Sequence, residues 1–468
     1  MRNTLMLVLI LFFVLPAPRV WAAGAAIQSA GPGQIHEAEQ NPEPDARFKA
    51  DILVIVAHPD DETMVTGYLA RAIFDGQKRV AAIFGTPGNS GGDVGSNAQA
   101  AALGDVRITE AREALASFGV LHVWCLGGPD TPGEDVRRSL ETWNHGNALW
   151  QTVRLVRLTR PEVILTWLPD FVVGENHDDH QAAAVIATEA FDMAGDPTAF
   201  PEQVAPPDNR TAVSNLTEGL QPWQPKKIYY FSDAASTDFL IGKGPEYNTT
   251  DISLSKNLPY YKLAAQEMAY HLTQDDTGQL AKHALETGDF TYFKQPVRLV
   301  LGKSLVAGDI TGDVFEGITS GAIPYAPARG YRAGARKGIS VELGGPWAYY
   351  QEFWQAHSLD RMAELIKTPE MGVDNGEQVH VPILIHNDTD EAVEVVLAST
   401  LPPGWKELRG TARYPVRPHE VYPAQTVYEA PTTAKPESQT LHWKAESRGA
   451  VVGTIALRVV TDRQGLPQ

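Results

Sequence analysis

The sequence predicts a doubly wound α/β domain followed by an all-β sandwich domain. Over the first half of the 468-residue chain, short apolar runs alternate with segments of helical periodicity. Apolar strands separated by helices are typical of a mostly parallel, Rossmann-like sheet that helices cover on both faces. Beyond residue 370, alternating strands between Pro and Gly turns are typical of a β-sandwich. The length also favours more than one domain.

The first residues have the pattern of an export signal. Arg2 precedes an apolar run at residues 5–15, and small residues follow around Ala22. The run is too short to span a bilayer, so we expect residues 1–22 to be a cleaved signal peptide and the mature protein to be secreted or periplasmic. A membrane anchor is the alternative. No other segment is apolar enough to span a membrane, and the polar residues 23–47 predict a flexible lead-in.

Apolar runs predict the strands of the first domain at residues 51–57, 79–85, 121–127, 161–168 and 226–231. Helical spacing predicts helices at residues 63–76, 107–119, 149–160 and 258–274. We expect this domain to span residues 48–320. A Gly-rich and helical segment, 321–370, should connect it to the sandwich at 371–468.

Charge limits the class of partner. The formal net charge is −18, and no block of five or more like charges occurs. Nucleic acids need a clustered basic surface, so we expect no nucleic-acid partner. The sequons at Asn209 and Asn215 matter only if the host glycosylates exported proteins. The sequence leaves the oligomeric state open.

The stretch "AHPDDE" begins where the strand 51–57 ends. Open α/β sheets bind ligands in the crevice beyond the carboxyl ends of their strands, so His58, Asp60 and Asp61 should lie there. One imidazole and two carboxylates are costly to bury unless they bind or pair with a cation. A helix start stabilised by acidic residues is the alternative interpretation.

A second polar stretch, "ENHDDH", follows the strand 161–168. His177 and His180 are three residues apart, so both can lie on one side of a first helical turn. The two stretches can therefore converge. His58, Asp61 and His180 would supply two nitrogens and one oxygen with positions open to water, which is the pattern of catalytic zinc. Two histidines and a carboxylate also suit Fe²⁺, so ligand type does not fix the metal.

"AHPDDE" followed by the HxDH pattern at residues 177–180 resembles the PIG-L/LmbE family of metal-dependent N-acetylglucosaminyl deacetylases and related amidases. "RITEAREALASFGV" is similar to the Arg/Glu helix of that family. "KLAAQEMAYHLTQ" is similar to its late Lys…His-x-Ser-Gln segment, with Thr273 where serine is usual. The resemblance covers residues 50–320.

The resemblance implies roles for five residues. His58, Asp61 and His180 would bind zinc. Asp60 would be the general base, and His177 would stabilise the oxyanion or deliver a proton.

Four further residues have weaker indications. Asp179 would orient a histidine ligand. Asp130 stands where the family has a substrate-binding acid, although an ordinary turn aspartate is the alternative. Arg107 could contact substrate, but a surface ion pair with Glu110 is favoured. His271 resembles the late family histidine and could line the pocket, or could be a packed helix residue.

The sequence therefore predicts a secreted zinc hydrolase that removes the N-acetyl, or another N-acyl, group of an amino sugar or glycoconjugate. A zinc amidase acting on a non-carbohydrate amide is one alternative. A non-catalytic carbohydrate-binding protein that keeps the metal pocket is another. "LPPGW" at 401–405 resembles Ig-like domains attached to secreted carbohydrate enzymes, which predicts an accessory role for the sandwich.

Overall fold

The structure is a computed structural model, which describes residues 43–91, 97–131, 133, 135–171, 177–206, 219–234, 236–274, 277–332, 334, 336–365, 369–433, 435 and 437–461. The expected signal peptide, most of the lead-in and both sequons, at Asn209 and Asn215, lie outside these residues.

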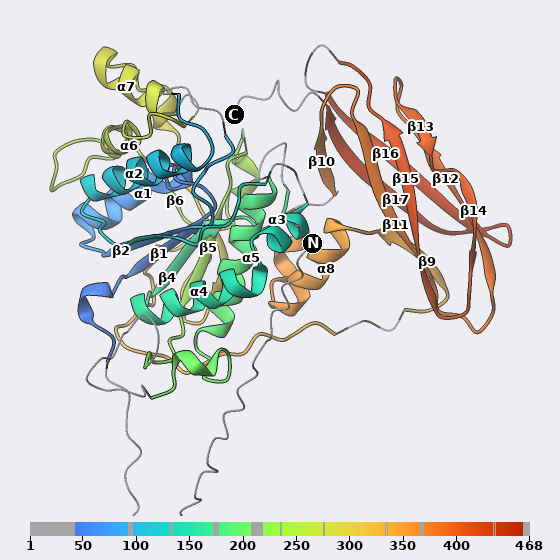
Figure 1. The fold of residues 1–468 in the computed structure, drawn as a ribbon, viewed down its shortest axis with the longest axis horizontal. Helices are drawn as coiled ribbons and strands as arrows, with labels where there is room; N and C mark the ends of the chain where they lie inside the picture. The colour runs from blue at the N-terminus through green and yellow to red at the C-terminus, as the bar shows by residue number, and fades with distance from the viewer. Residues whose placement is uncertain are drawn as a thin grey trace, which may run out of the picture. The chain divides into compact units, whose positions relative to one another are not determined.

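The first part of the chain is built on a six-stranded sheet with the order β3-β2-β1-β4-β5-β8 (Figure 1). The strands are β1 (Ile52–Val56), β2 (Val80–Phe84), β3 (Val123–Cys125), β4 (Val163–Trp167), β5 (Lys227–Phe231) and β8 (Val300–Ser304). Strands β1 to β5 pair in parallel, and β8 pairs antiparallel to β5. Every residue of the central strand β1 is buried, which is why its sequence is continuously apolar. The predicted mostly parallel sheet is confirmed.

Helices cover both faces of this sheet. They are α1 (Thr66–Ala70), α2 (Ala101–Ser117), α3 (Val136–Thr142), α4 (His145–Thr159), α5 (Asp178–Met193), α6 (Tyr260–Met268) and α7 (Thr277–Thr287). In Figure 1, α1, α2 and α6 lie on one side of the strands and α3, α4 and α5 on the other. A short pair of strands, β6 (Glu246–Tyr247) and β7 (Val297–Arg298), completes this part.

The helices predicted at 107–119 and 149–160 correspond to α2 and α4, which begin earlier, at Ala101 and His145. The other two predicted helices differ more. The helix expected at 63–76 consists of a 3₁₀ turn at Asp61–Val65, the short α1, and a π-helical turn at Arg71–Asp75. The helix expected at 258–274 is wrong beyond Met268, where α6 ends. The segment that follows α6 carries buried polar side chains whose partners lie on other elements, and helical periodicity does not detect such partners.

The C-terminal part is a β-sandwich, as predicted. Its two sheets have the orders β10-β17-β16-β12-β14 and β13-β15-β11-β9. The strands are β9 (Ile339–Leu343), β10 (Glu370–Val373), β11 (Gln378–Asn387), β12 (Val393–Thr400), β13 (Lys406–Arg409), β14 (Ala412–Val416), β15 (Glu420–Glu429), β16 (Glu437–Ser447) and β17 (Ala450–Thr461). Both sheets contribute to one apolar core that includes Trp405 and Trp443. The likeness to Ig-like domains stays a prediction.

The chain between the two parts contributes to both cores. Strand β9 pairs with β11 of the sandwich. The next helix, α8 (Pro346–Ala356), carries Tyr350, Phe353 and Trp354, which belong to the apolar core of the α/β part. The Tyr350 hydroxyl donates a hydrogen bond to Oε1 of Gln181 on α5 at 2.7 Å.

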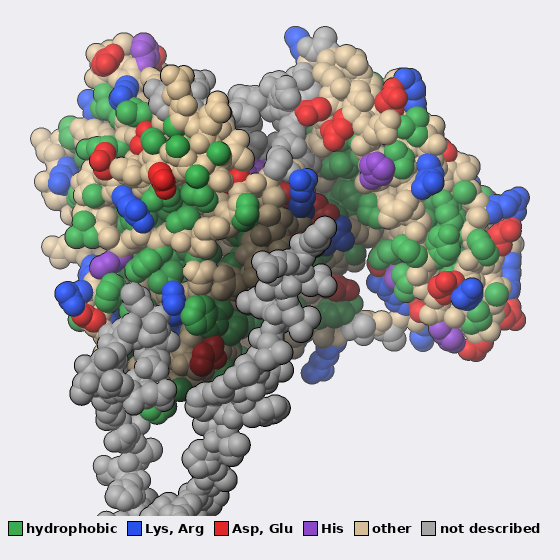
Figure 2. Space-filling view, viewed as in Figure 1, with side chains coloured by type: hydrophobic (Ala, Val, Ile, Leu, Met, Phe, Trp, Pro, Cys, Tyr) green, Lys and Arg blue, Asp and Glu red, His purple; other side chains and the backbone are tan. Residues whose placement is uncertain are grey.

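Charged side chains of both signs are interspersed on the surface shown in Figure 2. No helix among the described residues is long and apolar enough to cross a membrane.

Candidate functional site

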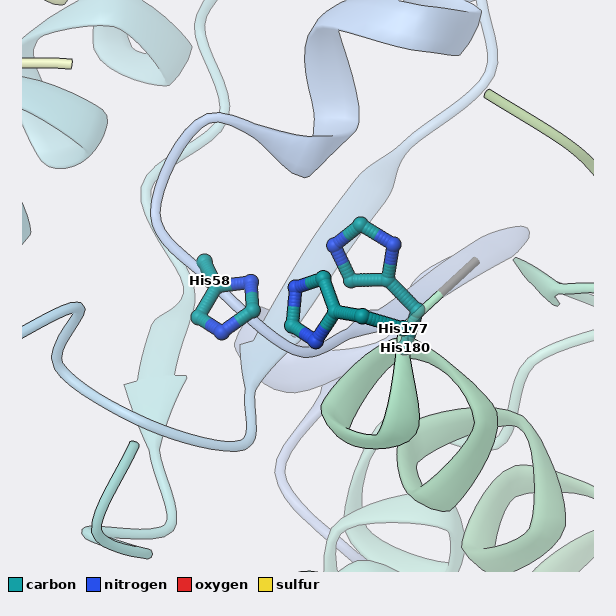
Figure 3. A group of neighbouring side chains, drawn as sticks. All are labelled: His58, His177 and His180. Atoms are coloured by element: carbon teal, nitrogen blue, oxygen red, sulfur yellow. The ribbon is translucent and has the colours of Figure 1, made fainter. Parts of the chain in front are cut away.

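Three histidines from two distant segments meet at the carboxyl end of the central strands (Figure 3). His58 follows β1, His177 caps the N-terminus of α5, and His180 lies in the first turn of that helix. The ring centroids of His58 and His180 are 5.2 Å apart, and those of His177 and His180 are 4.0 Å apart. One nitrogen of each ring lies within 4.8 Å of the others. The two sequence motifs are therefore brought together.

Asp61 lies between two of these histidines. Its Oδ1 is 3.5 Å from His58 Nδ1 and 3.3 Å from His180 Nε2. Its Oδ2 accepts hydrogen bonds from the backbone N–H groups of Ala57 and His58, at 2.8 and 2.9 Å, and from Trp167 Nε1 at 2.6 Å. Burial opposes ionisation of this carboxyl, but His180 and His58 outweigh it and hold the pKa of Asp61 well below its usual value. Asp61 thus presents one charged oxygen to the histidines.

One nitrogen of His180 faces away from Asp61, and this outer nitrogen, Nδ1, pairs with a carboxylate. Its Nδ1 is 2.9 Å from Oδ2 of Asp233, which follows β5, and its ring stacks on Trp167 with centroids 4.3 Å apart. Burial would lower the pKa of His180, but Asp61 and Asp233 raise it to about 10. A carboxylate on the outer nitrogen fixes both the ring orientation and the nitrogen that remains for a ligand. Nε2 therefore faces Asp61.

His58 has a matching arrangement. Its Nε2 is 3.5 Å from Asp179 Oδ2 and 3.7 Å from Asp130 Oδ1. Asp179 is fully buried and accepts hydrogen bonds from the Thr131 backbone N–H at 2.8 Å and from Ser139 Oγ at 2.6 Å. Asp179 therefore lies beside one histidine of the site, His58, and its role in orienting that ring stays a prediction.

The predicted metal ligands fit a divalent cation. Asp61 Oδ1 lies near His58 Nδ1 and His180 Nε2, while Asp61 Oδ2, His58 Nε2 and His180 Nδ1 each lie beside another protein group. Two imidazole nitrogens and one carboxylate oxygen suit Zn²⁺ and also Fe²⁺. The assignment of these three residues as ligands stays a prediction.

Asp60 precedes the 3₁₀ turn and has φ 148° and ψ −17°, a backbone region that L-residues rarely adopt. Such a conformation costs about 1–3 kcal/mol and persists only where its surroundings enforce it. Burial, with Asp61 adding to it, raises the pKa of Asp60 to about 7. A carboxyl group with this pKa can accept and release a proton near neutral pH.

His177 caps the helix through its ring. Its Nδ1 accepts the backbone N–H of Asp179 at 3.3 Å. The neutral ring therefore carries its proton on Nε2, which makes that nitrogen a hydrogen-bond donor. The side chain is 30 % exposed, so this donor nitrogen can be reached from solvent.

Two of the weaker candidates lie near the site in different ways. Asp130 approaches His58 with one oxygen and accepts hydrogen bonds on the other from the N–H and Oγ of Ser90, at 2.8 and 3.1 Å. The sequence favoured a surface position for Arg107, in an ion pair with Glu110. In the structure Arg107 is buried instead. It donates to the backbone carbonyls of Gly88 and Thr273, at 2.7 and 3.0 Å.

His271 belongs to a separate buried cluster with Glu62 and Glu267. Its Nε2 is 3.0 Å from Glu62 Oε1, and all three side chains are fully buried. Burial and the neighbouring Glu62 raise the pKa of Glu267 to about 8. Burial would lower the pKa of His271, but Glu62 outweighs it and raises it to about 9. Burial thus favours the neutral form of Glu267, while the neighbouring Glu62 favours the charged form of His271.

Sequence reasoning missed three residues. Asp233 is the first acidic residue after the strand at 226–231, so the same strand-end argument could have found it. Trp167 and Gln274 contact the site turn through side-chain hydrogen bonds that no local pattern indicates.

Comparison with known proteins finds a family match over part of the chain. Residues 53–191 match the model of the PIG-L family, described as GlcNAc-PI de-N-acetylase. A 1D-myo-inositol 2-acetamido-2-deoxy-alpha-D-glucopyranoside deacetylase from Geodermatophilus obscurus is 33 % identical over 167 residues, which are 32 % of this chain and 56 % of that protein. The enzyme of the same name from Streptomyces scabiei is 27 % identical over 311 residues, 59 % of this chain and 92 % of that protein.

Among solved structures, N,N'-diacetylchitobiose deacetylase from Pyrococcus horikoshii matches with a TM-score of 0.38 and 16 % identity, over 54 % of this chain and 84 % of that one.

The chain spans little more than half the length of the Geodermatophilus relative. The family match covers both polar motifs, from β1 through α5. The chain therefore contains a PIG-L family domain, at residues 53–191.

Proposed function

We propose that the protein is a metal-dependent N-deacetylase that hydrolyses the N-acetyl, or another N-acyl, group of an amino sugar or glycoconjugate. The PIG-L domain supports this proposal, as do the names of two relatives, which are deacetylases of a 2-acetamido-2-deoxy-glucopyranoside. The observation that carries it is the arrangement of His58, Asp61 and His180, in which Asp61 Oδ1 lies 3.5 Å from His58 Nδ1 and 3.3 Å from His180 Nε2.

The donor set fits Zn²⁺, with Fe²⁺ as the alternative, and His58, Asp61 and His180 would hold the ion. A zinc ion there supplies Lewis acidity, which acidifies water and polarises a carbonyl oxygen. Trp167 and Asp233 orient two of the ligands before any ion binds, so little rearrangement is needed.

Asp60 acts as the general base. Its pKa of about 7 lets it accept the proton of a water molecule that adds to the amide carbonyl carbon. His177 donates a hydrogen bond from Nε2 to the oxygen of that carbonyl, where negative charge develops. The C–N bond then breaks, the proton passes to the nitrogen, and the products are acetate and a free amine.

The rim of the site favours a polar substrate. The Asp130 side chain lies beside His58 and is only 6 % exposed, and its Oδ1 lacks a hydrogen-bond partner within the described residues. A carboxylate in that position suits the hydroxyl groups of a sugar, which donate hydrogen bonds. Asp130 is therefore assigned to substrate binding within this proposal.

The base is tested with Asp60→Asn. This variant keeps the size of the side chain but cannot accept the proton, so hydrolysis should fall by about 10²–10⁴-fold while metal content stays unchanged. Acetate release from N-acetylated sugars, oligosaccharides and polymers measures the first quantity, and elemental analysis the second. Asp105→Asn, on the exposed surface of α2, is the matched control and should keep full activity.

Two results would contradict the proposal. Full activity in Asp60→Asn would remove the assigned base, and acetate release that survives complete metal removal would remove the metal. A wild-type protein that binds these sugars but releases no acetate would instead indicate the carbohydrate-binding alternative.

Export is part of the same proposal and is supported by the apolar run and small residues within 1–22. Mature protein outside the cytoplasm that begins near residue 23 would support it. Full-length protein that retains residues 1–22 would contradict it.

A further inference from the structure

The segment that follows α6, residues 269–274, contacts the catalytic turn on both sides of Asp60. Gln274 Nε2 donates a hydrogen bond to the carbonyl oxygen of Pro59. His271 Nε2 lies 3.0 Å from Oε1 of Glu62. Gln274 is 4 % exposed and His271 is fully buried, so water does not compete for these contacts.

Asp60 needs such support. Its φ of 148° is unfavourable for a residue with a Cβ, and its side chain makes no capping hydrogen bond to the turn that follows. Its backbone N–H donates to the His58 carbonyl at 3.1 Å, and its own carbonyl accepts the Thr63 N–H at 2.8 Å. The segment 269–274 adds a contact to the neighbouring residues on each side of Asp60.

Helix α2 fixes the segment in turn. Arg107 Nη2 donates to the carbonyl of Thr273 at 3.0 Å. Glu110, one helical turn later, accepts the Thr273 backbone N–H at 3.2 Å and its Oγ1 at 2.8 Å. A serine at position 273, which the family pattern has, could make the same hydroxyl contact. Thr273 therefore keeps the hydrogen bond to Glu110. Arg107 is buried, so water does not compete for its contact with the segment.

We propose that Gln274 and His271 are positioning residues that hold the backbone on the two sides of Asp60 and so aim its carboxylate. This inference rests on the proposed function, in which Asp60 is the general base. Neither side chain is hydrogen-bonded to His58, Asp61 or His180, so their effect should fall on the chemical step rather than on metal binding.

The test compares Gln274→Met with a matched control. Methionine has a similar length but no N–H donor. Gln224→Met removes a buried Nε2 donor to the carbonyl of Phe191 at 3.0 Å, together with bonds to the Pro225 carbonyl at 3.2 Å and from the Ala326 N–H at 3.3 Å, far along the chain from the catalytic turn. The general cost of losing buried hydrogen bonds should therefore be at least as large in this control as in Gln274→Met.

We expect Gln274→Met to lower kcat by about 10–100-fold, because small misplacements of a catalytic group have effects of this size. KM should stay within about twofold and metal content should not change. Gln224→Met should keep kcat. The inference is overturned if the two variants lose the same fraction of kcat, or if the loss in Gln274→Met appears in KM or in metal content.

A second measurement does not depend on activity. Crystal structures of the wild type and Gln274→Met should show Asp60 at positive φ in the first and displaced in the second. An unchanged Asp60 in the variant would overturn the inference even if the protein hydrolyses no tested substrate.

The contact of His271 is tested with two substitutions. His271→Gln keeps a donor for Glu62, so its kcat should fall less than that of His271→Leu. Equal kcat losses in the two variants would count against a role for the contact with Glu62.

Discussion

At the scale of single residues, the candidate metal site depends on protein contacts to the ligand atoms that face away from the other ligands. Asp61 Oδ2 accepts three N–H groups, and His180 Nδ1 lies against Asp233. Each contact restricts a rotation that would otherwise cost entropy when an ion binds. The ligands are therefore oriented by the protein itself.

Asp233 should control metal affinity. Asp233→Asn removes the charge that fixes the ring of His180, so we expect the Kd for Zn²⁺ to rise by about 10–100-fold. Competition with a chromophoric chelator measures this Kd. Asp238→Asn is the control, because Asp238 lies nearby in the chain but is largely exposed. An unchanged Kd in Asp233→Asn would show that the ring is held by other contacts.

At the scale of elements, the ends of helices decide which side chains reach the site. Helix α5 begins at Asp178, so His177 and His180 face the same side of its first turn. Helix α6 ends at Met268, which frees residues 269–274 to run past the catalytic turn. The following helix packs closely on this segment: a Cβ at Gly278 would lie 1.9 Å from the carbonyl oxygen of His271.

Gly278→Ala should therefore destabilise the protein. The contact is with backbone, which cannot move aside easily, so we expect a loss of about 1–3 kcal/mol of unfolding free energy. Gly146→Ala in α4 is the matched control, because a Cβ there meets nothing within 4 Å. It should be neutral or stabilise the helix by up to about 1 kcal/mol. Denaturant unfolding compares the two, and equal effects would contradict the close approach.

The secondary structure also shows how far periodicity predicts elements. The five parallel strands of the sheet were predicted within about two residues, because a buried strand between two layers of helices must be apolar throughout. The antiparallel strand β8 was not predicted. The helix at 63–76 was not predicted correctly, since three kinds of turn share one apolar pattern there.

At the scale of the whole molecule, the site joins residues that lie far apart in the sequence. His58 and Asp61 come from the turn after β1, His180 from α5, and Asp233 from the turn after β5. The unfolded chain does not hold these groups together, so an ion that binds them binds only the folded state.

Metal should therefore raise thermal stability. At a free Zn²⁺ concentration 100 times the Kd, we expect the folded state to gain about 2.7 kcal/mol, and a chelator should reverse the rise in Tm. Differential scanning calorimetry measures both. His180→Ala should lose most of the shift, and an equal shift in that variant would place the bound ion elsewhere.

The amino-acid pattern predicted the five parallel strands, several of the helices and the two polar motifs at strand ends. It predicted these because burial of a strand and the start of a helix depend on local residue pattern. It also indicated His58, Asp61 and His180 as ligands, since parallel strands bring their carboxyl ends to one edge.

Only the tertiary structure decided which side chains support those groups. Trp167 on Asp61, Asp233 on His180, and Gln274 on Pro59 are contacts between residues distant in the chain. Arg107 looked like a surface residue because its charged neighbour Glu110 lies one turn away, yet both hold Thr273 in the interior. Such contacts depend on how the elements pack in three dimensions. The residue pattern along one element does not indicate which residues of a neighbouring element will contact it.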